Sequence, residues 1–140
     1  MTTVSIRDVL VPALRQRFPA RPFVEGVPPN PVATFPAAHS TVGDLLILDD
    51  GEEATVVIGR HTHSHFNPYD ATLSPDQLAQ VVTDSVLQFL TDLFDDRVLI
   101  WSVPGRSGGW TILPREPLRM PPDADKFLWS GPLPTTREPA

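Results

Sequence analysis

The stretch Leu45–Ile58, LLILDDGEEATVVI, decides the fold that we predict for this chain. Two runs rich in strand-forming residues, LLIL and ATVVI, flank the polar segment DDGEE, which contains an Asp-Gly turn signal. The second strand can continue to Phe66 before Asn67-Pro68 turns the chain. The pattern therefore predicts a β-hairpin over about residues 44–66.

Helical patterns lie on both sides of this hairpin. Downstream, the segment Ser74–Gln77 combines a capping serine, a proline suited to a first turn and a glutamine that can complete a capping box. It predicts a helix over about 75–95, and upstream the spacing of apolar residues predicts another over about 5–18, interrupted only by Pro12. The apolar stripe of the downstream helix consists of Leu78, Val82, Val86, Phe89 and Leu93, widened by Val81, Leu90 and Phe94.

The rest of the chain contains a second hairpin and two proline-rich segments. Strand-like runs around the loop Pro-Gly-Arg-Ser-Gly-Gly predict a hairpin over about 98–113. Segment 19–40 is expected to be mostly irregular, with one short strand, and the tail 114–140 holds enough apolar residues for part of it to dock. We predict an α+β fold: a single domain, residues 1–113, with an antiparallel sheet of about four to five strands covered on one face by two helices.

Composition narrows the class of protein. A chain of 140 residues with 41% hydrophobic and 20% charged residues is typical of one globular domain. The net charge of −6 and the absence of a cluster of basic residues argue against a nucleic-acid partner. The apolar runs are too short to span a membrane, no secretory signal is recognisable and cysteine is absent, so we expect a soluble, cytoplasmic protein.

The sharpest candidate for chemistry is His61-Thr62-His63-Ser64-His65. Residues two apart on a strand point to one face, so His61, His63 and His65 can present three imidazoles together, and imidazole binds zinc and similar divalent metals. The three positions span about 13 Å from end to end, so a single ion is bound more comfortably by two of them. A fourth ligand could come from His39, Tyr69, Asp70 or water.

The parity of this strand predicts where the histidines lie. If the strand is unbroken from Ala54, they share a face with Thr55 and Val57, opposite the helix-covered face of Phe66. A bulge at Gly59 would reverse this arrangement. The histidines are then either a polar, exposed part of the strand with ordinary hydrogen bonds or a metal site, and both interpretations stay open.

Other patterns are weaker. The acidic residues around the first hairpin are interpreted as solvated turn and strand-edge positions; they are Asp44, Asp49, Asp50, Glu52 and Glu53. Segment Arg106–Gly109 lacks the Gly-Lys-Ser/Thr ending of a phosphate loop, and no Gly-x-Ser-x-Gly elbow is present. No complete catalytic constellation is recognisable.

Three functional hypotheses follow. The first is a non-enzymatic protein-interaction module, of a binding or immunity-like kind, without a cofactor and with a surface formed by His61, His63, His65 and Tyr69. The second is a metal-binding protein or metal-dependent hydrolase that uses the same histidines, with zinc or another divalent metal and Asp70 as a candidate base. The third is self-association through an exposed sheet edge.

Overall fold

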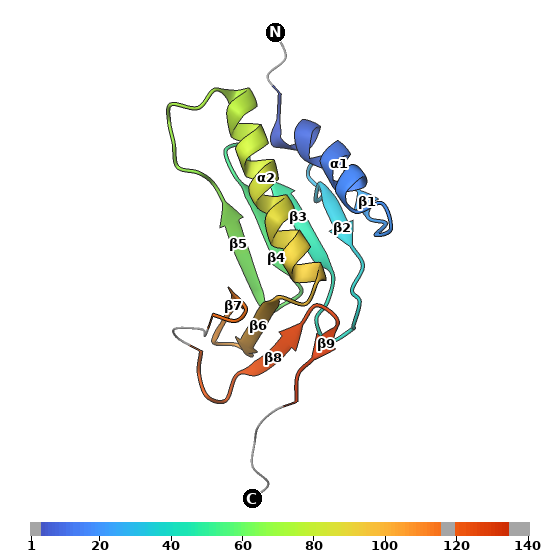
Figure 1. Ribbon diagram of the computed structural model, residues 1–140, viewed down its shortest axis with the longest axis vertical. Coiled ribbons are helices and arrows are strands. Elements are labelled where there is room, and N and C mark those ends of the chain that lie inside the picture. Colours follow the sequence, from blue (N-terminus) through green and yellow to red (C-terminus); the bar gives the residue numbers. More distant parts are fainter. Residues whose placement is uncertain (1–3, 116–119, 135–140) are drawn as a thin grey trace, which may run out of the picture.

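The computed structural model describes residues 4–115 and 120–134, in which two helices and two antiparallel sheets form an α+β fold (Figure 1). The helices are α1 (Ile6–Arg17) and α2 (Pro75–Phe94). The first sheet contains, in spatial order, β1 (Val24–Glu25), β2 (Ala33–Phe35), β3 (Leu45–Asp49), β4 (Ala54–Ile58) and β5 (Thr62–Phe66). The second sheet has the spatial order β7-β6-β8-β9; its strands are β6 (Val98–Val103), β7 (Ser107–Ile112), β8 (Asp125–Leu128) and β9 (Gly131–Pro132). The predicted fold class is confirmed.

Both helices begin after a capping serine, which the sequence analysis predicted for α2 at Ser74 but not for α1 at Ser5. The Ser5 hydroxyl accepts a hydrogen bond from the Asp8 N–H, and the Asp8 carboxylate accepts one from the Ser5 N–H. Ser74 and Gln77 make the same reciprocal pair at the start of α2. Each box pairs two N–H groups that the first turn of a helix leaves without intrahelical partners, and so stabilises the start of its helix.

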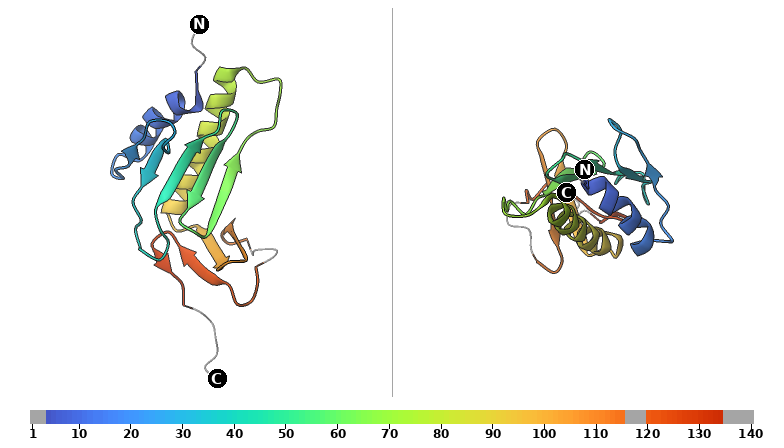
Figure 2. Two further views of the ribbon diagram at one scale, coloured as in Figure 1. Left: turned by 180° about the vertical axis from the view of Figure 1, so that it is seen from behind. Right: turned by 90° about the horizontal axis from the view of Figure 1, so that it is seen from above.

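The helices pack on one face of the first sheet and leave the other face uncovered by helices (Figures 1 and 2). The covered face contributes Leu45, Ile47, Val56 and Ile58, each at most 1% exposed. Burying each such side chain contributes about 1.5–3 kcal/mol. Val81, predicted to widen the stripe of α2, is 37% exposed instead. In the described part of the chain, neither helix has the length and apolar character needed to cross a membrane.

The prediction that strand β4 continues to Phe66 is wrong. It ends at Ile58, the chain turns at residues 59–61, and β5 returns antiparallel to β4. Gly59 has φ +51°, in the left-handed region that favours glycine, and its backbone packs so closely on Val42 that a Cβ would clash. The predicted hairpin over 44–66 is therefore three strands.

The second hairpin, β6–β7, forms where predicted but belongs to the other sheet. The other neighbour of β6 is β8, which comes from the segment predicted as a proline-rich tail. In that segment Phe127 and Trp129 are 7% and 3% exposed and join the core. Val98, Leu99 and Ile100 are all buried, so both faces of β6 are covered by other parts of the protein. A hairpin of β6 and β7 alone could not bury these side chains. Segment 19–40 forms two short strands, β1 and β2, rather than one.

Candidate functional site

The candidate site lies on the face of the first sheet that the helices do not cover. The register aligns Leu46, Val57 and His63 in one row across β3, β4 and β5, and Leu48, Thr55 and His65 in the next row. Residues paired across adjacent strands project to the same side of a sheet. We define the open face by these six residues: Leu46, Leu48, Thr55, Val57, His63 and His65. It lies on the side predicted for His63 and His65, because the three-residue turn 59–61 pairs odd-numbered positions of β4 with odd-numbered positions of β5.

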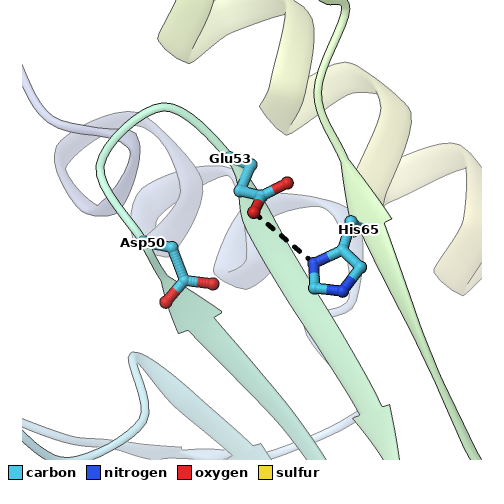
Figure 3. A group of neighbouring side chains, drawn as sticks. All are labelled: Asp50, Glu53 and His65. Carbon is cyan, nitrogen blue, oxygen red and sulfur yellow. Dashed lines mark ion pairs between the residues drawn. The ribbon is translucent and has the colours of Figure 1, made fainter.

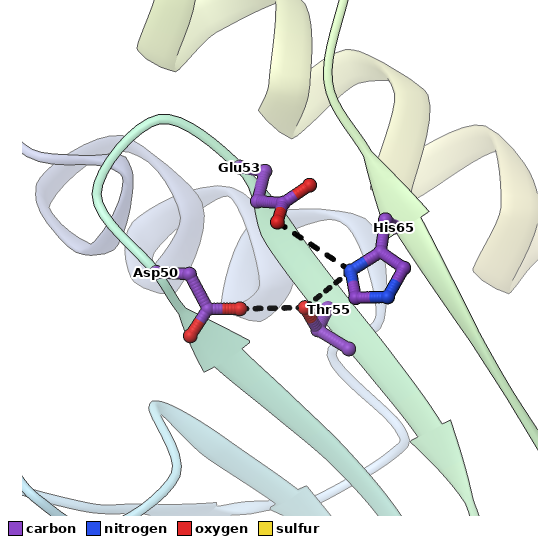
Figure 4. A network of polar contacts seen from close by, with 4 residues as sticks. All are labelled: Asp50, Glu53, Thr55 and His65. Atoms are coloured by element: carbon purple, nitrogen blue, oxygen red, sulfur yellow. Dashed lines mark hydrogen bonds and ion pairs between the residues drawn. The ribbon is translucent and has the colours of Figure 1, made fainter.

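A turn between β3 and β4 brings two carboxylates to one end of the open face. Gly51, with φ +90°, donates its N–H to Asp49 Oδ1 at 2.9 Å, and Asp50 donates its N–H to the Glu53 carbonyl at 2.9 Å. This closes the turn and places the side chains of Asp50 and Glu53 beside His65, which pairs with Thr55 across β4 and β5 (Figures 3 and 4). Two residues of the DDGEE turn are thus more than solvated turn positions.

Thr55 is the centre of a polar network at this end (Figure 4). Its hydroxyl donates to Asp50 Oδ2 at 2.6 Å and lies 3.1 Å from His65 Nδ1. A hydroxyl has one hydrogen, so once it donates to Asp50 it accepts from the Nδ1–H of His65. His65 Nδ1 also lies 3.5 Å from Glu53 Oε1. Thr55 is only 4% exposed, whereas the His65 side chain is 47% exposed, so a buried hydroxyl orients an accessible imidazole.

Asp50, Glu53 and His65 are the group in the described residues whose donor atoms could hold a metal ion. One donor atom from each residue lies within 4.8 Å of the other two. Two carboxylates and one imidazole suit zinc and other borderline divalent ions, and three protein ligands would leave a coordination position open. A metal on Nδ1 would have to displace the proton that Thr55 and Glu53 share, so metal and proton would compete for one atom.

The three histidines of the sequence motif do not converge. His63 is exposed, and its ring centroid lies 5.1 Å from that of His65, outside the carboxylate group. His61 lies in the turn before β5 and points to the second sheet, where its ring packs on Phe127 with centroids 4.2 Å apart. Its Nε2 donates to the Thr41 carbonyl at 2.7 Å, and Nδ1 lies 2.7 Å from the Ser102 hydroxyl, so both nitrogens are occupied.

The other predicted site residues lie apart from this group. Tyr69 is 81% exposed in the loop after β5, and its N–H donates to Asn67 Oδ1. Asp70 accepts hydrogen bonds from the Thr72 hydroxyl and N–H, and these bonds hold the pKa of its carboxyl below the ordinary value. His39 Nδ1 accepts from Thr41 within its own turn. None of the three belongs to the group of metal-capable donors.

Sequence reasoning missed Asp50, Glu53 and Thr55 as partners of His65. The signal was present in the turn at Gly59: a three-residue turn pairs position 58 with 62 and therefore Thr55 with His65. An unbroken strand through position 66 hides this pairing, because it moves His65 far from the DDGEE turn.

Comparison with protein-family models, with curated proteins and with solved structures finds no match to this chain. The residues themselves therefore provide the basis for a functional proposal.

Proposed function

We propose that this protein is a non-enzymatic protein-interaction module that docks a partner on the open face of its first sheet. The observation that carries the proposal is that Leu46, Leu48 and Val57 remain partly accessible on a face that no helix of the described residues covers. An accessible apolar centre beside polar groups is the usual composition of a protein interface. Both described helices, α1 and α2, pack on the other face of this sheet.

The rim of the open face indicates the charge of the partner. Asp50, Glu52 and Glu53 lie at one end of it, and the whole chain has a net charge of −6. Acidic groups at the rim of an interface steer oppositely charged partners and discriminate against acidic ones. A partner surface with lysine or arginine beside apolar side chains is the complement.

The test is site-specific photo-crosslinking in cells from position 63, compared with position 16 on the exposed side of α1. The identified partner is then purified and its affinity measured for Leu46→Asp and for the control Gln16→Asp. We expect Leu46→Asp to weaken binding at least about tenfold, because a charge would be buried in the interface, and Gln16→Asp to leave it unchanged. Equal affinities of the two variants would refute docking on the open face.

The group of Asp50, Glu53 and His65 supports a second candidate function, the binding of a divalent metal ion. Zinc titration of untagged protein, followed by calorimetry, should give one equivalent bound by the parent and by His63→Ala and none by His65→Ala or Asp50→Asn. Binding that survives His65→Ala would exclude this site. A hydrolase would additionally need a base near the metal-bound water, and Asp70 is engaged by Thr72 in its own loop.

A further inference from the structure

A groove lies on the helix side of the molecule, between α2 and the ends of β5 and β7. Its volume is about 410 Å³, and it is outside the open face. Three aromatic rings line it in a row: the centroids of Phe66 and Phe89 lie 5.4 Å apart, and those of Phe89 and Trp110 lie 4.6 Å apart. The polar lining comes from α2 and consists of Asp84, Gln88 and Asp92, with Ser85 beside them.

Asp92 is an unusual residue in this groove, because it is a carboxylate that is only 8% exposed. Its carboxylate accepts one long hydrogen bond, from Gln88 Nε2 at 3.3 Å. Within residues 4–115 and 120–134, no basic side chain forms an ion pair with Asp92; the ion pairs there are Arg15–Glu25 and His65–Glu53. The carboxylate lines the groove, so a cation brought by a ligand could complement it, because a charge-assisted hydrogen bond is stronger than the long one from the Gln88 amide.

The shape of the groove and its surroundings indicate what carries the cation. About 410 Å³ holds a few side chains but not a folded element. Beside it, β5 is the last strand of the first sheet. β7 contacts β5, with Gly108 packed on the backbone of His61 just before the start of β5, but in the described part of the chain no strand is hydrogen bonded to the outer edge of β5. An extended segment added to that edge would direct alternate side chains to the groove, beside Phe66, and to the open face, beside His65.

We infer that the groove receives an arginine side chain from an extended segment of the partner protein, which pairs with the edge of β5. This inference rests on the proposed function, because it identifies the kind of partner that docks. A guanidinium donates two hydrogen bonds to one carboxylate and stacks on aromatic faces, so a single arginine would satisfy Asp92 and lie against Trp110 or Phe89. Asp84 adds a second negative charge at the rim, and none of the described residues that line the groove is basic.

The experiment uses a capped peptide in which arginine and valine alternate, and a matched peptide with citrulline in place of each arginine. Affinity is measured by calorimetry, and Trp110→Phe is used to assign any change of tryptophan fluorescence to the groove. We expect the parent protein to bind the arginine peptide at least about tenfold more tightly than the citrulline peptide. We also expect the arginine peptide to bind the parent at least about tenfold more tightly than it binds Asp92→Asn. Asp76→Asn, which removes the same charge from the first turn of α2, should bind like the parent.

Equal binding of the two peptides, or equal binding to Asp92→Asn and the parent, would overturn the inference, as would a dimer formed through β5 that excludes the peptide. Failure of the groove is distinguishable from failure of the proposed function. If the affinity of the partner falls with Leu46→Asp but not with Asp92→Asn, docking on the open face is supported and arginine binding in the groove is refuted. If the affinity falls with Asp92→Asn but not with Leu46→Asp, binding in the groove is supported and docking on the open face is refuted.

Discussion

His61 and His65 are the two ends of one short histidine motif, and the structure places them in opposite kinds of environment. His61 lies between the sheets, with both ring nitrogens hydrogen bonded and its ring on Phe127. His65 lies on the open face, where one nitrogen is oriented by Thr55 and the side chain is 47% exposed. A residue whose polar atoms are all satisfied inside the fold contributes to stability, and one held by a buried neighbour but open to solvent is available for binding.

The largest expected effect comes from removing the aromatic ring on which His61 packs. Phe127→Ala should lower the free energy of unfolding by about 3–5 kcal/mol, because the side chain is 7% exposed and its loss leaves a cavity in the core beside His61. Chemical denaturation monitored by circular dichroism measures this. A loss below about 1 kcal/mol would mean that the second sheet does not depend on this contact.

His61→Ala should cost about 1–3 kcal/mol, because it leaves the Ser102 hydroxyl, in a residue only 6% exposed, and the Thr41 carbonyl without their partner. The matched control is His63→Ala, which removes an exposed imidazole and should change the free energy of unfolding by less than about 0.5 kcal/mol. Similar losses of unfolding free energy in His61→Ala and His63→Ala would contradict the structural role assigned to His61.

Thr55→Val tests the orientation of His65 at nearly constant side-chain volume. The loss of the 2.6 Å bond to Asp50 should cost about 1 kcal/mol of stability and release the imidazole from its fixed orientation. In NMR spectra the His65 ring signals should become averaged, while those of His61 stay unchanged. An unchanged His65 ring would show that Glu53 alone orients it.

The smallest effect is a pH dependence in the loop after the His65 end. Hydrogen bonds from Thr72 lower the pKa of the Asp70 carboxyl, so the folded state binds its proton less readily than the unfolded state does. The resulting stability is present above the ordinary aspartate pKa and is lost as the pH falls through the lowered pKa of the folded state. Asp70→Asn should flatten this acid-side decline slightly, and an NMR titration of Asp70 gives the pKa directly. A midpoint at or above the ordinary aspartate value would contradict the assignment.

The elements that sequence reasoning located are those whose signals are local. Ser74 meets its capping partner Gln77 three residues later, and this signal predicted the start of α2, whereas α1 was predicted from the spacing of its apolar residues. The strands of the two predicted hairpins likewise follow from short apolar runs. The candidate site was readable only in part: His65 was identified, but its neighbours Asp50 and Glu53 depend on the register of β4 with β5, which the turn at Gly59 sets.

By itself the sequence determined the helices, the strands of both hairpins and the side of the first sheet on which His63 and His65 lie, because capping, turn chemistry and strand parity act over a few residues. The tertiary structure decided that β6 takes β8 as its neighbour, that His61 turns to the second sheet and that Asp92 is buried in a groove. Those outcomes depend on which distant surfaces are buried together. Burial is a non-directional interaction, so no single stretch of the chain specifies its partner.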